Sequence, residues 1–467
     1  MKKHEIYEGI VTSLKFPNKG IVECGEDRCM VKNVLPGQHV LFRVTKKRNG
    51  NCEGNLIEVK TPAPNECEPM CRHFGVCGGC SYQNLPYEEQ LALKESQVRE
   101  LMKGVNGLTV EDVERLMQPI VPSPVRFEYR NKMEFSFGDA CRDGELELGL
   151  HKKGSFYDIV TVKDCQIVDD DFRKILTETL AYFRGKEVSY YHKRTHEGYL
   201  RHLLVRKAVK TGEILVDLVT SSQTPADTIC CEKSILEDWA DVIKSLKLRG
   251  RIAGVLNTVN DSVADTVVNE GTTVLYGQDY FYEEILGLKF KITPFSFFQT
   301  NSLSAEVLYD TARKLVLGMA KSGITIYDLY SGTGTIAQLL SPVAGKVIGV
   351  EIIEEAVEAA KENAKLNDLH NCDFLAGDVL KVLDEIEEKP DFIVLDPPRD
   401  GINPKALNKI IGYGVDNIVY ISCKPTSLAR DLETFIARGY EVKTIIPIDQ
   451  FPGTVHVETV VLMSKVK

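Results

Sequence analysis

The sequence has no run of about 18 apolar residues, so it predicts no membrane-spanning helix. Its first segment, MKKHEIYEGIV, turns polar and acidic after two lysines, so we expect that it is not a secretory signal peptide. Internal repeats and low-complexity tracts are also missing. Hydrophobic residues at 43% and charged residues at 27% match a globular composition and exclude wholesale disorder. For a chain of 467 residues we therefore expect a soluble, cytoplasmic protein of about two to four domains, without a membrane partner.

The chain also lacks an excess of positive charge, since its formal net charge of −10 taken alone argues against a nucleic-acid partner. The distribution points the other way, because residues 1–60 carry a net +4, residues 121–210 carry +3 and the remainder carries −17. Residues 190–206 interleave tyrosines with Lys, Arg and His. This mixture suits RNA, because cations neutralise phosphates and rings stack on unpaired bases. An ordinary solvated surface is the alternative.

The order of hydrophobic patterns predicts a multidomain protein. Five short β-rich segments separated by turn signals fill residues 5–59 and fit a small OB-like barrel. Residues 87–102 have helical spacing, and residues 125–292 are again β-rich, with LRHLLVRKAV and EILVDLVT as a hairpin. From residue 304 onward helices alternate with apolar strands, which predicts a mostly parallel, doubly wound α/β sheet of the Rossmann-like kind.

A cofactor pocket is predicted where the strand ITIYDLY runs into the glycine-containing segment 331–335. Glycines at the carboxyl end of a first strand let a ligand approach the backbone. Glu351 ends the next strand, nineteen residues after Gly332, a spacing typical of an acid that binds ribose hydroxyls. Ala337 stands where a dinucleotide fingerprint has its third glycine, which favours S-adenosylmethionine. A generic nucleotide-binding sheet is the alternative.

Two reactive side chains are predicted at the same edge of that sheet. Cys423 follows the strand NIVYIS, so its thiol lies at the carboxyl end of a parallel strand, although a buried, inert cysteine would show the same pattern. Glu458 lies in HVETVVL beside His456 and a β-branched run, where a carboxylate is placed to accept a proton. An ion-paired acid is the alternative for Glu458.

The thirteen cysteines include a tight group, Cys71-x5-Cys77-x2-Cys80, with glycines between them. Thiolates at this spacing suit zinc or an iron–sulfur cluster, and free thiols remain possible. A metal centre needs a fourth ligand, for which Cys165 is our choice, while Cys67 would compete.

Several motifs together resemble the RumA/TrmA-type RNA (uracil-5-)-methyltransferase family: SFFQTN, DLYSGTGT, DPPRDG, SCKP and HVETVVL, in that order. The resemblance covers essentially the whole chain and implies that Cys423 is the nucleophile and Glu458 the proton-abstracting base. It implies S-adenosylmethionine contacts from four further residues, Gln299, Tyr330, Glu351 and Asp396. It also implies a TRAM-type barrel and a [4Fe–4S] cluster held by Cys71, Cys77, Cys80 and Cys165.

Because the chain has both the barrel and the cysteine group, it is most similar to the family's ribosomal RNA enzymes. The implied activity is methylation of carbon-5 of a specific uridine in 23S ribosomal RNA, with no obligate protein partner. The same chemistry on transfer RNA and a non-catalytic RNA-binding iron–sulfur protein are the alternatives. A radical S-adenosylmethionine enzyme is disfavoured, because it needs Cys-x3-Cys-x2-Cys and this chain has a gap of five after Cys71.

We expect three modules that interrupt one another along the chain: the barrel over residues 1–62, a β-rich cluster domain over 63–85 and 120–292, and a methyltransferase domain over 86–119 and 293–467. The helix near residues 87–118 carries an apolar stripe that needs a partner, and we expect it to pack on the methyltransferase sheet rather than on the barrel. The stripe consists of Leu91, Val98, Leu101 and Met102.

Overall fold

The computed structural model describes residues 1–48, 50–186, 188–223, 232–264, 266–319, 323–385 and 389–466. Its contacts divide the chain into two compact units. The first unit consists of residues 1–70, 80–123 and 397–467, and the second of residues 71–79 and 124–396. The three domain ranges expected from the sequence do not coincide with these units and stay a prediction.

The first unit begins with a closed five-stranded barrel in the order β1-β2-β3-β5-β4. The alternation of buried and exposed side chains explains these strands: in β4, Val40, Phe42 and Val44 are buried, whereas their neighbours in the strand are not. The expected small N-terminal barrel is therefore present. Its strands are β1 (Ile6–Lys15), β2 (Lys19–Cys24), β3 (Asp27–Lys32), β4 (His39–Arg48) and β5 (Asn51–Thr61).

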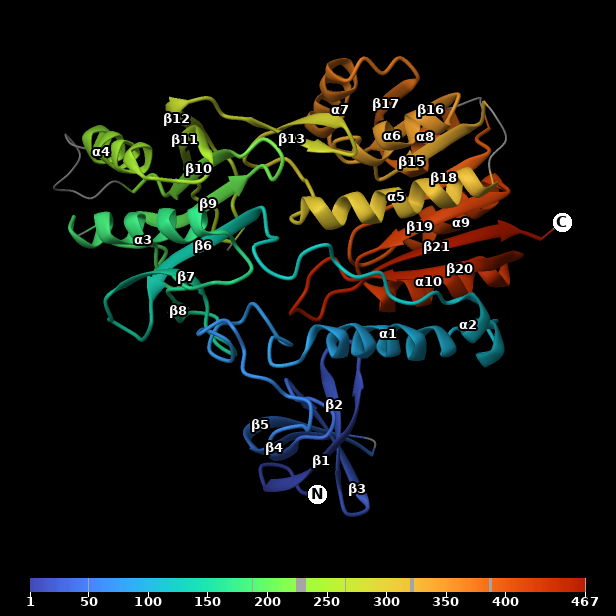
Figure 1. The fold of residues 1–467 in the computed structure, drawn as a ribbon, viewed down its shortest axis with the longest axis horizontal. Coiled ribbons are helices and arrows are strands. Elements are labelled where there is room, and N and C mark those ends of the chain that lie inside the picture. Colours follow the sequence, from blue (N-terminus) through green and yellow to red (C-terminus); the bar gives the residue numbers. More distant parts are fainter. Residues whose placement is uncertain are drawn as a thin grey trace. The chain divides into compact units, whose positions relative to one another are not determined.

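Helix α1 (Tyr87–Lys103) lies between the barrel and the C-terminal strands of the same unit (Figure 1). Toward the barrel, Leu93 packs on the cluster that contains Leu35, and the Gln97 amide donates to the Pro17 carbonyl at 3.5 Å. On its other side α1 contacts helix α10 (Pro425–Ala437). We expected this helix to pack on the methyltransferase sheet rather than on the barrel, so its contacts with the barrel contradict that prediction.

The predicted apolar stripe of α1 is also only half right. Val98 and Met102 are buried, whereas Leu91 and Leu101 are half-buried. Polar side chains share the buried face, with Lys94 completely buried. After α2 (Val110–Leu116), residues 117–121 run alongside β20 (Tyr440–Ile448) through parallel bridges.

The remaining strands of the first unit are β19 (Asn417–Ser422) and β21 (Glu458–Lys465), in the order β19-β21-β20. Both pairings are antiparallel. Helix α10 packs on β19 and β20, and α9 (Pro404–Tyr413) precedes β19 in the chain.

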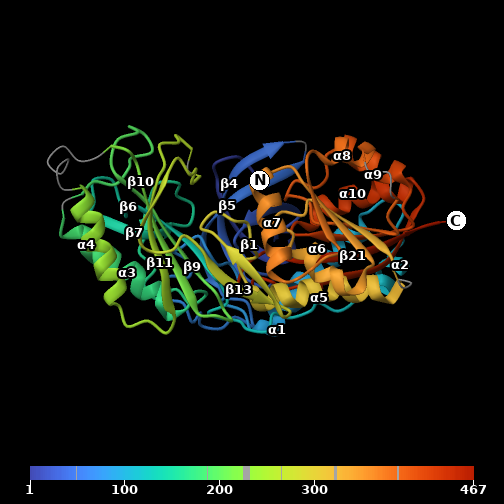
Figure 2. The ribbon, with the colours of Figure 1, turned by 90° about the horizontal axis from the view of Figure 1, so that it is seen from above.

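The second unit holds a mixed sheet in the order β12-β11-β10-β9-β6-β7-β8. The expected hairpin is present as antiparallel β9 and β10. Two helices in this stretch were not predicted: α3 (Asp170–Arg184) and α4 (Glu232–Ser245) lie side by side against one face of the sheet (Figure 2). The strands are β6 (Lys132–Asp139), β7 (Leu146–His151), β8 (Ile159–Val160), β9 (Leu200–Lys207), β10 (Glu213–Thr220), β11 (Arg251–Val259) and β12 (Thr272–Gly277).

A hairpin of β13 (Phe281–Ile285) and β14 (Leu288–Ile292) leads to four parallel strands in the order β17-β16-β15-β18. These strands are short. β18 consists of apolar residues only, and every residue of β15 and β18 is buried, as in parallel strands that are covered by helices. They are β15 (Thr325–Leu329), β16 (Lys346–Glu351), β17 (Cys372–Ala376) and β18 (Phe392–Leu395). The accompanying helices are α5 (Ser302–Met319), α6 (Thr335–Leu340), α7 (Glu354–Leu366) and α8 (Val379–Glu385), with a 3-10 turn at Ser341–Val343.

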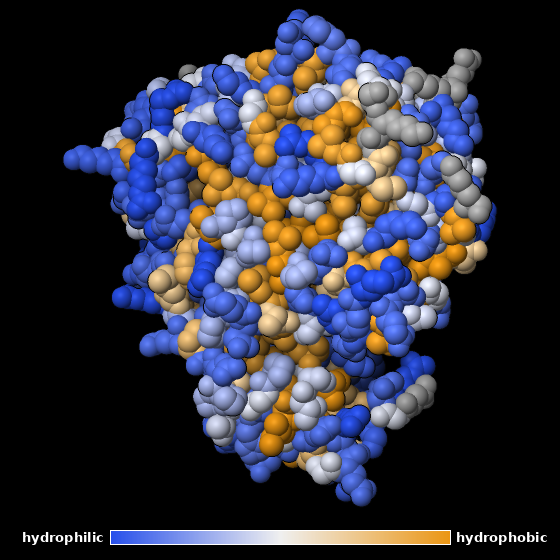
Figure 3. Space-filling view, turned by 45° about the vertical axis from the view of Figure 1, so that its right-hand side comes forward, coloured by the Kyte–Doolittle hydropathy of each residue, from blue (hydrophilic) through white to orange (hydrophobic). Residues whose placement is uncertain are grey.

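The surface is mixed rather than uniformly polar. On the face in Figure 3, the barrel at the bottom shows apolar side chains among hydrophilic ones. Ile6, Ile10 and Ile57 are among the exposed apolar residues of the barrel. No helix among the described residues is long and apolar enough to cross a membrane.

Candidate active site

The predicted cofactor segment lies between β15 and α6 in a tight backbone turn. Tyr330, Gly332 and Gly334 have φ values of 69°, 52° and 73°. The amides of Tyr330 and Ser331 donate to the Val350 carbonyl at 3.0 and 3.1 Å, which holds the turn against β16. A backbone in this left-handed region favours glycine, and it leaves amide groups turned toward the carboxyl end of the strands.

Glu351, at the end of β16, is joined directly to this turn. Its Oε2 accepts the Gly332 amide at 3.0 Å, and its Oε1 accepts the amides of Ile352 and Ile353 at 2.9 and 3.1 Å. The structure therefore brings Gly332 and Glu351 together, as their spacing predicted, and Tyr330 lies in the same turn. Oε1 already accepts two hydrogen bonds and Oε2 only one, so Oε2 keeps an acceptor site for a ligand.

Two further carboxyl groups lie beside the turn. Asp328 of β15 is fully buried, and its Oδ2 accepts the Ala337 amide of α6 at 2.9 Å. Burial, and then the nearby charge of Asp396, raises the pKa of Asp328 to about 8. Burial alone raises the pKa of Asp396, which follows β18, to about 7. Sequence reasoning missed Asp328, although an acid inside the apolar run ITIYDLY is a visible signal.

Gln299 lies on the segment that precedes α5, and this segment also reaches the turn. The Thr333 hydroxyl donates to the Phe297 carbonyl at 3.4 Å, and the Asn131 amide nitrogen donates to the Gln299 carbonyl at 3.0 Å. Arg206 of β9 holds the start of the segment by donating to three backbone carbonyls at 2.7–3.1 Å, those of Thr293, Pro294 and Ser296. The sequence suggested an RNA contact for Arg206, but the side chain is 1% exposed and serves this internal role.

In the first unit, Cys423 and Glu458 each stand one residue beyond the last pair of one antiparallel ladder. That last pair is Ser422 with Thr459, and Cys423 lies in the bend that directly follows β19, while Glu458 is the first residue of β21. Glu458 is 4% exposed, and Cys423 is half-buried two residues before helix α10. The predicted nucleophile and base thus share one end of β19 and β21.

The loop that carries Glu458 is held by residues far away in the chain. Lys94 of α1 donates to Asp449 Oδ1 at 2.6 Å and to the Phe451 carbonyl at 3.1 Å, and both charged side chains are completely buried. The Gly453 amide donates to Gln90 Oε1 at 2.8 Å. These contacts fix the loop before Glu458, and sequence reasoning did not find them.

The DPPRDG segment is tied to the same region of the first unit. Arg399 lies 3.3 Å from His456 Nδ1, and its carbonyl accepts the Ser427 hydroxyl of α10 at 2.8 Å. Arg430 donates to the Asp400 carbonyl at 2.8 Å. Arg430 also donates to the Asp431 carboxylate at 2.8 Å, so its charge is balanced within the fold. These contacts hold the segment after β18 against α10 and His456.

The cysteine group is divided between the two units. Cys71, Cys77 and Cys165 are buried in the second unit, and Cys80 belongs to the first, three residues after Cys77. Burial raises the pKa of Cys77, and it raises that of Cys165 to about 11; the nearby Cys71 contributes to both shifts. Among the described residues, no group of three or more Cys, His, Asp or Glu is arranged to hold a metal ion. The donor chemistry, three neighbouring buried thiols, nevertheless fits a thiolate-bound iron–sulfur group.

The parallel strands, the glycine turn and the carboxylates beside it define an enzyme of the α/β methyltransferase class. The profile of the tRNA (Uracil-5-)-methyltransferase family matches residues 202–466. An uncharacterized RNA methyltransferase of Clostridium tetani is 48% identical and covers 99% of this chain and 98% of its own length. Another from Caldanaerobacter subterraneus subsp. tengcongensis is 47% identical over 100% of both chains. The chain therefore belongs to this family of S-adenosylmethionine-dependent uracil-5 RNA methyltransferases, as the motifs indicated.

Among solved structures, the Pyrococcus abyssi tRNA (uracil-54, C5)-methyltransferase in complex with S-adenosyl-L-homocysteine has the same fold. It matches with a TM-score of 0.74 at 23% identity and covers 98% of this chain and 100% of its own. The likeness extends over both the N-terminal barrel and the methyltransferase part.

Proposed function

We propose that this protein methylates carbon-5 of a specific uridine in 23S ribosomal RNA, with S-adenosylmethionine as the methyl donor. The observation that carries the proposed chemistry is the pairing of β19 with β21, whose last pair, Ser422 with Thr459, is flanked in the chain by Cys423 and Glu458. A nucleophile and a base near the same end of two paired strands suit a reaction at two adjacent carbons of one ring.

The reaction begins when the Cys423 thiolate adds to carbon-6 of the uracil and forms a carbon–sulfur bond. The electrons of the 5,6 double bond move into an enolate, which makes carbon-5 nucleophilic. Carbon-5 then takes the methyl group of the sulfonium donor as the methyl–sulfur bond breaks and the donor leaves as a neutral thioether, and Glu458 removes the carbon-5 proton. The double bond re-forms and the thiolate leaves. The base must leave any helical stack to reach these groups.

The proposed cofactor contacts are Gln299, Tyr330, Glu351 and Asp396. Support comes from the turn that joins Tyr330 to the Glu351 strand and from the charge of the site. Asp328 and Asp396 are carboxyl groups whose pKa values are raised to about 8 and about 7. A cationic sulfonium ligand would favour their ionised forms, so cofactor binding should release protons near neutral pH.

The catalytic roles are tested by two variants that should fail differently. Cys423→Ala should form no covalent RNA adduct and transfer no methyl group, because carbon-5 is not activated. Glu458→Gln should add and methylate but retain the carbon-5 proton, so a methylated protein–RNA adduct should accumulate on a denaturing gel. Cys141→Ala and Glu441→Gln change exposed residues of the same types and should behave like the unaltered enzyme. Normal turnover by Glu458→Gln, or an adduct with Cys423→Ala, would overturn the assignment.

The barrel and cysteine group favour ribosomal RNA within the family, but the Pyrococcus enzyme gives a specific reason to weigh transfer RNA. That enzyme is named for a transfer RNA uridine and matches 98% of this chain, barrel included. Mapping of 5-methyluridine in both RNAs from cells that lack this protein separates the two. Loss from 23S ribosomal RNA is the expected result, and loss only from transfer RNA would correct the substrate.

We also propose a [4Fe–4S] cluster on Cys71, Cys77, Cys80 and Cys165, with a structural role, because four cysteine ligands leave no iron open. Protein purified without oxygen should contain about four iron atoms per chain. Cys71→Ser and Cys165→Ser should lose iron, whereas Cys67→Ser should keep it because Cys67 is exposed. Stoichiometric zinc, or iron loss with Cys67→Ser, would refute this ligand set.

A further inference from the structure

The cationic, tyrosine-rich stretch singled out in the sequence is mostly internal. Arg201 is 5% exposed and donates to the carbonyls of Asn260 and Ser262 at 2.6 and 2.8 Å. His202 and Tyr199 are 3% and 2% exposed. These side chains organise the central sheet and cannot form a broad RNA-binding surface. The accessible part is the loop around Lys193 and Arg194.

This loop meets the loop between β7 and β8, where two aromatic rings are exposed. Phe156 is 60% exposed and Tyr157 is 46% exposed. Lys193 Nζ lies 4.8 Å from the Phe156 ring centre, and Arg194 Cζ lies 4.2 Å from that of Tyr157. The two rings meet edge to face at 5.4 Å. Two rings and two cations therefore share one patch of the second unit.

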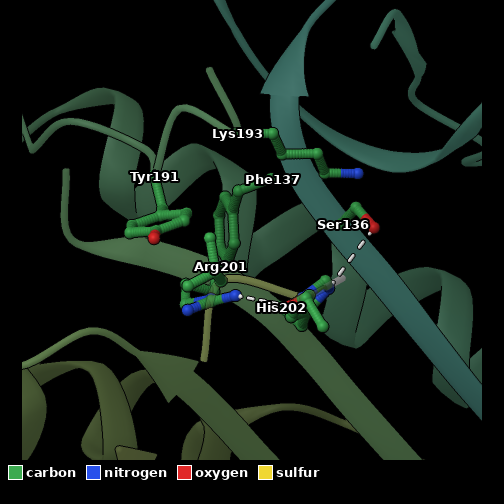
Figure 4. Close-up of a pocket in the computed structure, with 8 residues that line it drawn as sticks. Ser136, Phe137, Tyr191, Lys193, Arg201 and His202 are labelled. Carbon is green, nitrogen blue, oxygen red and sulfur yellow. Dashed lines mark hydrogen bonds between the residues drawn. The ribbon is translucent and has the colours of Figure 1, made fainter. Parts of the chain in front are cut away.

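Neighbouring side chains hold the patch in place. His151 stacks on Phe156 with ring centres 6.0 Å apart and planes at 10°, and its Nε2 lies 3.3 Å from Lys193 Nζ. Lys193 also lines a pocket whose other walls include Ser136, Tyr191, Arg201 and His202 (Figure 4). Arg201 lies 4.1 Å from the Tyr191 ring centre, which fixes the start of the loop. The aromatic patch is thus held in place before any ligand binds.

The charge around the patch is mainly positive. Residues 151–158 and 192–197 contain four Lys or Arg residues and two acidic residues, Asp158 and Glu197, for a net +2. Exposure of the apolar Phe156 ring to water is unfavourable. A base stacked on the ring would cover it, while the cations neutralise the phosphates. A comparable contact elsewhere lacks this combination: Lys244 lies 5.0 Å from the Tyr276 ring but pairs with Asp241 at 2.5 Å.

We propose that Phe156, Tyr157, Lys193 and Arg194 form a binding platform for an unpaired segment of the RNA substrate. A base stacks on Phe156 against the edge of Tyr157, and the flanking phosphates lie by Lys193 and Arg194. This platform lies on two loops of the second unit and adds an RNA contact remote in sequence from Cys423 and Glu458. It rests on the proposed function for the identity of the RNA, but not for the binding itself.

The test measures binding of a ten-nucleotide single-stranded RNA and of an RNA duplex of equal length to the full chain by fluorescence anisotropy. Phe156→Leu should weaken single-strand binding roughly 5- to 30-fold, the effect of one lost base stack. Lys193→Gln should weaken binding of the single strand and of the duplex to a similar extent. It should also reduce the slope of log affinity against log salt by about one. Tyr276→Leu and Lys244→Gln are the matched controls and should bind as the unaltered protein does.

Methylation by the same variants separates this proposal from the proposed function. Phe156→Leu should raise KM for RNA and leave kcat and S-adenosylmethionine affinity unchanged, which also shows that the variant is folded. If the unaltered enzyme methylates RNA but Phe156→Leu binds single strands normally, the platform is wrong and the function stands. If no RNA is methylated but single-strand binding falls as expected, the platform stands alone. If Phe156→Leu weakened duplex binding and single-strand binding equally, the stacking role would be refuted.

Discussion

Replacement of Lys94 by Met should loosen the contact between helix α1 and the loop before Glu458. Lys94 and Asp449 are both completely buried, with Nζ and Oδ1 2.6 Å apart. Asp449 Oδ2 is buried without a hydrogen-bond partner among the described residues, so the carboxylate relies on Lys94. Burial lowers the pKa of Lys94, and the Asp449 charge opposes that shift. Met keeps most of the volume of the side chain but removes the charge.

The size of the effect follows from the uncompensated carboxylate. Removal of one partner of a buried ion pair costs about 3–5 kcal/mol. At about 1.4 kcal/mol per factor of ten, the local opening equilibrium should rise roughly 150- to 5,000-fold. Lys94→Met combined with Asp449→Leu removes both charges and should recover at least about 2 kcal/mol of this loss, since apolar replacement of a buried pair is often neutral.

Hydrogen exchange read by mass spectrometry is the suitable assay, because it reports local opening without requiring the whole chain to unfold in one step. Amides of residues 87–103 should exchange faster in Lys94→Met by the factor given above. The matched control is Lys443→Met. Lys443 Nζ lies 2.7 Å from Glu441 Oε2, and the Glu441 side chain is 53% exposed. That surface pair should contribute less than about 1 kcal/mol.

Equal destabilisation by the single and the double variant would refute this reasoning. It would mean that α1 is held by shape alone and that the ion pair contributes nothing specific. Unchanged exchange in Lys94→Met would do the same, since a buried carboxylate would then persist without its counter-charge.

Four other substitutions test the cofactor turn, the central sheet and the segment before α5. Gly332→Ala should cost only about 1 kcal/mol in thermal unfolding, because its φ is +52° with nothing within 4 Å, whereas Gly334→Ala should cost several times more, because its Cβ would lie 2.5 Å from Phe374. Equal costs would contradict the crowding. Burial raises the pKa of Asp217 to about 7, so its stabilising contribution is present at low pH and is lost as pH rises from about 4 to 7; Asp217→Asn should flatten that part of a denaturation–pH profile, and an unchanged slope would be evidence against it. Arg206→Met should weaken S-adenosylmethionine binding at least about tenfold by calorimetry, since three carbonyls lose a charged donor, and an unaltered affinity would exclude that role.

Local patterns were enough to predict the barrel, helix α1 and the parallel strands. The reason is that alternation and glycine turns act within a few residues, as at Val40, Phe42 and Val44. The placement of Cys423 and Glu458 at strand ends was also visible, because each follows or begins an apolar run. Their closeness to the last pair of the β19–β21 ladder could not be predicted, because strand pairing joins residues far apart in the chain.

Long-range pairing of polar groups could not be predicted. Lys94 looks like a surface residue by type, yet it is buried against a residue 355 positions away. Arg201 and Arg206 look like nucleic-acid contacts, but backbone carbonyls take their donors. In each case tertiary packing determines the hydrogen-bond partner, and no residue spacing within the helix or strand predicts that partner. The helices α3 and α4 were missed because neighbouring strands dominated the pattern.

The burial of Lys94 has a consequence for synthesis on the ribosome. Its partner Asp449 emerges 355 residues later, which at ordinary elongation rates of about 5–20 residues per second is a delay of roughly 20–70 s. During that interval the barrel can fold, because its five strands lie within residues 6–61. Helix α1 must wait with its lysine in water and its buried face uncovered. The nascent chain therefore presents a long-lived amphipathic segment, and chaperones or the ribosome surface would be its first partners until the last strands are made.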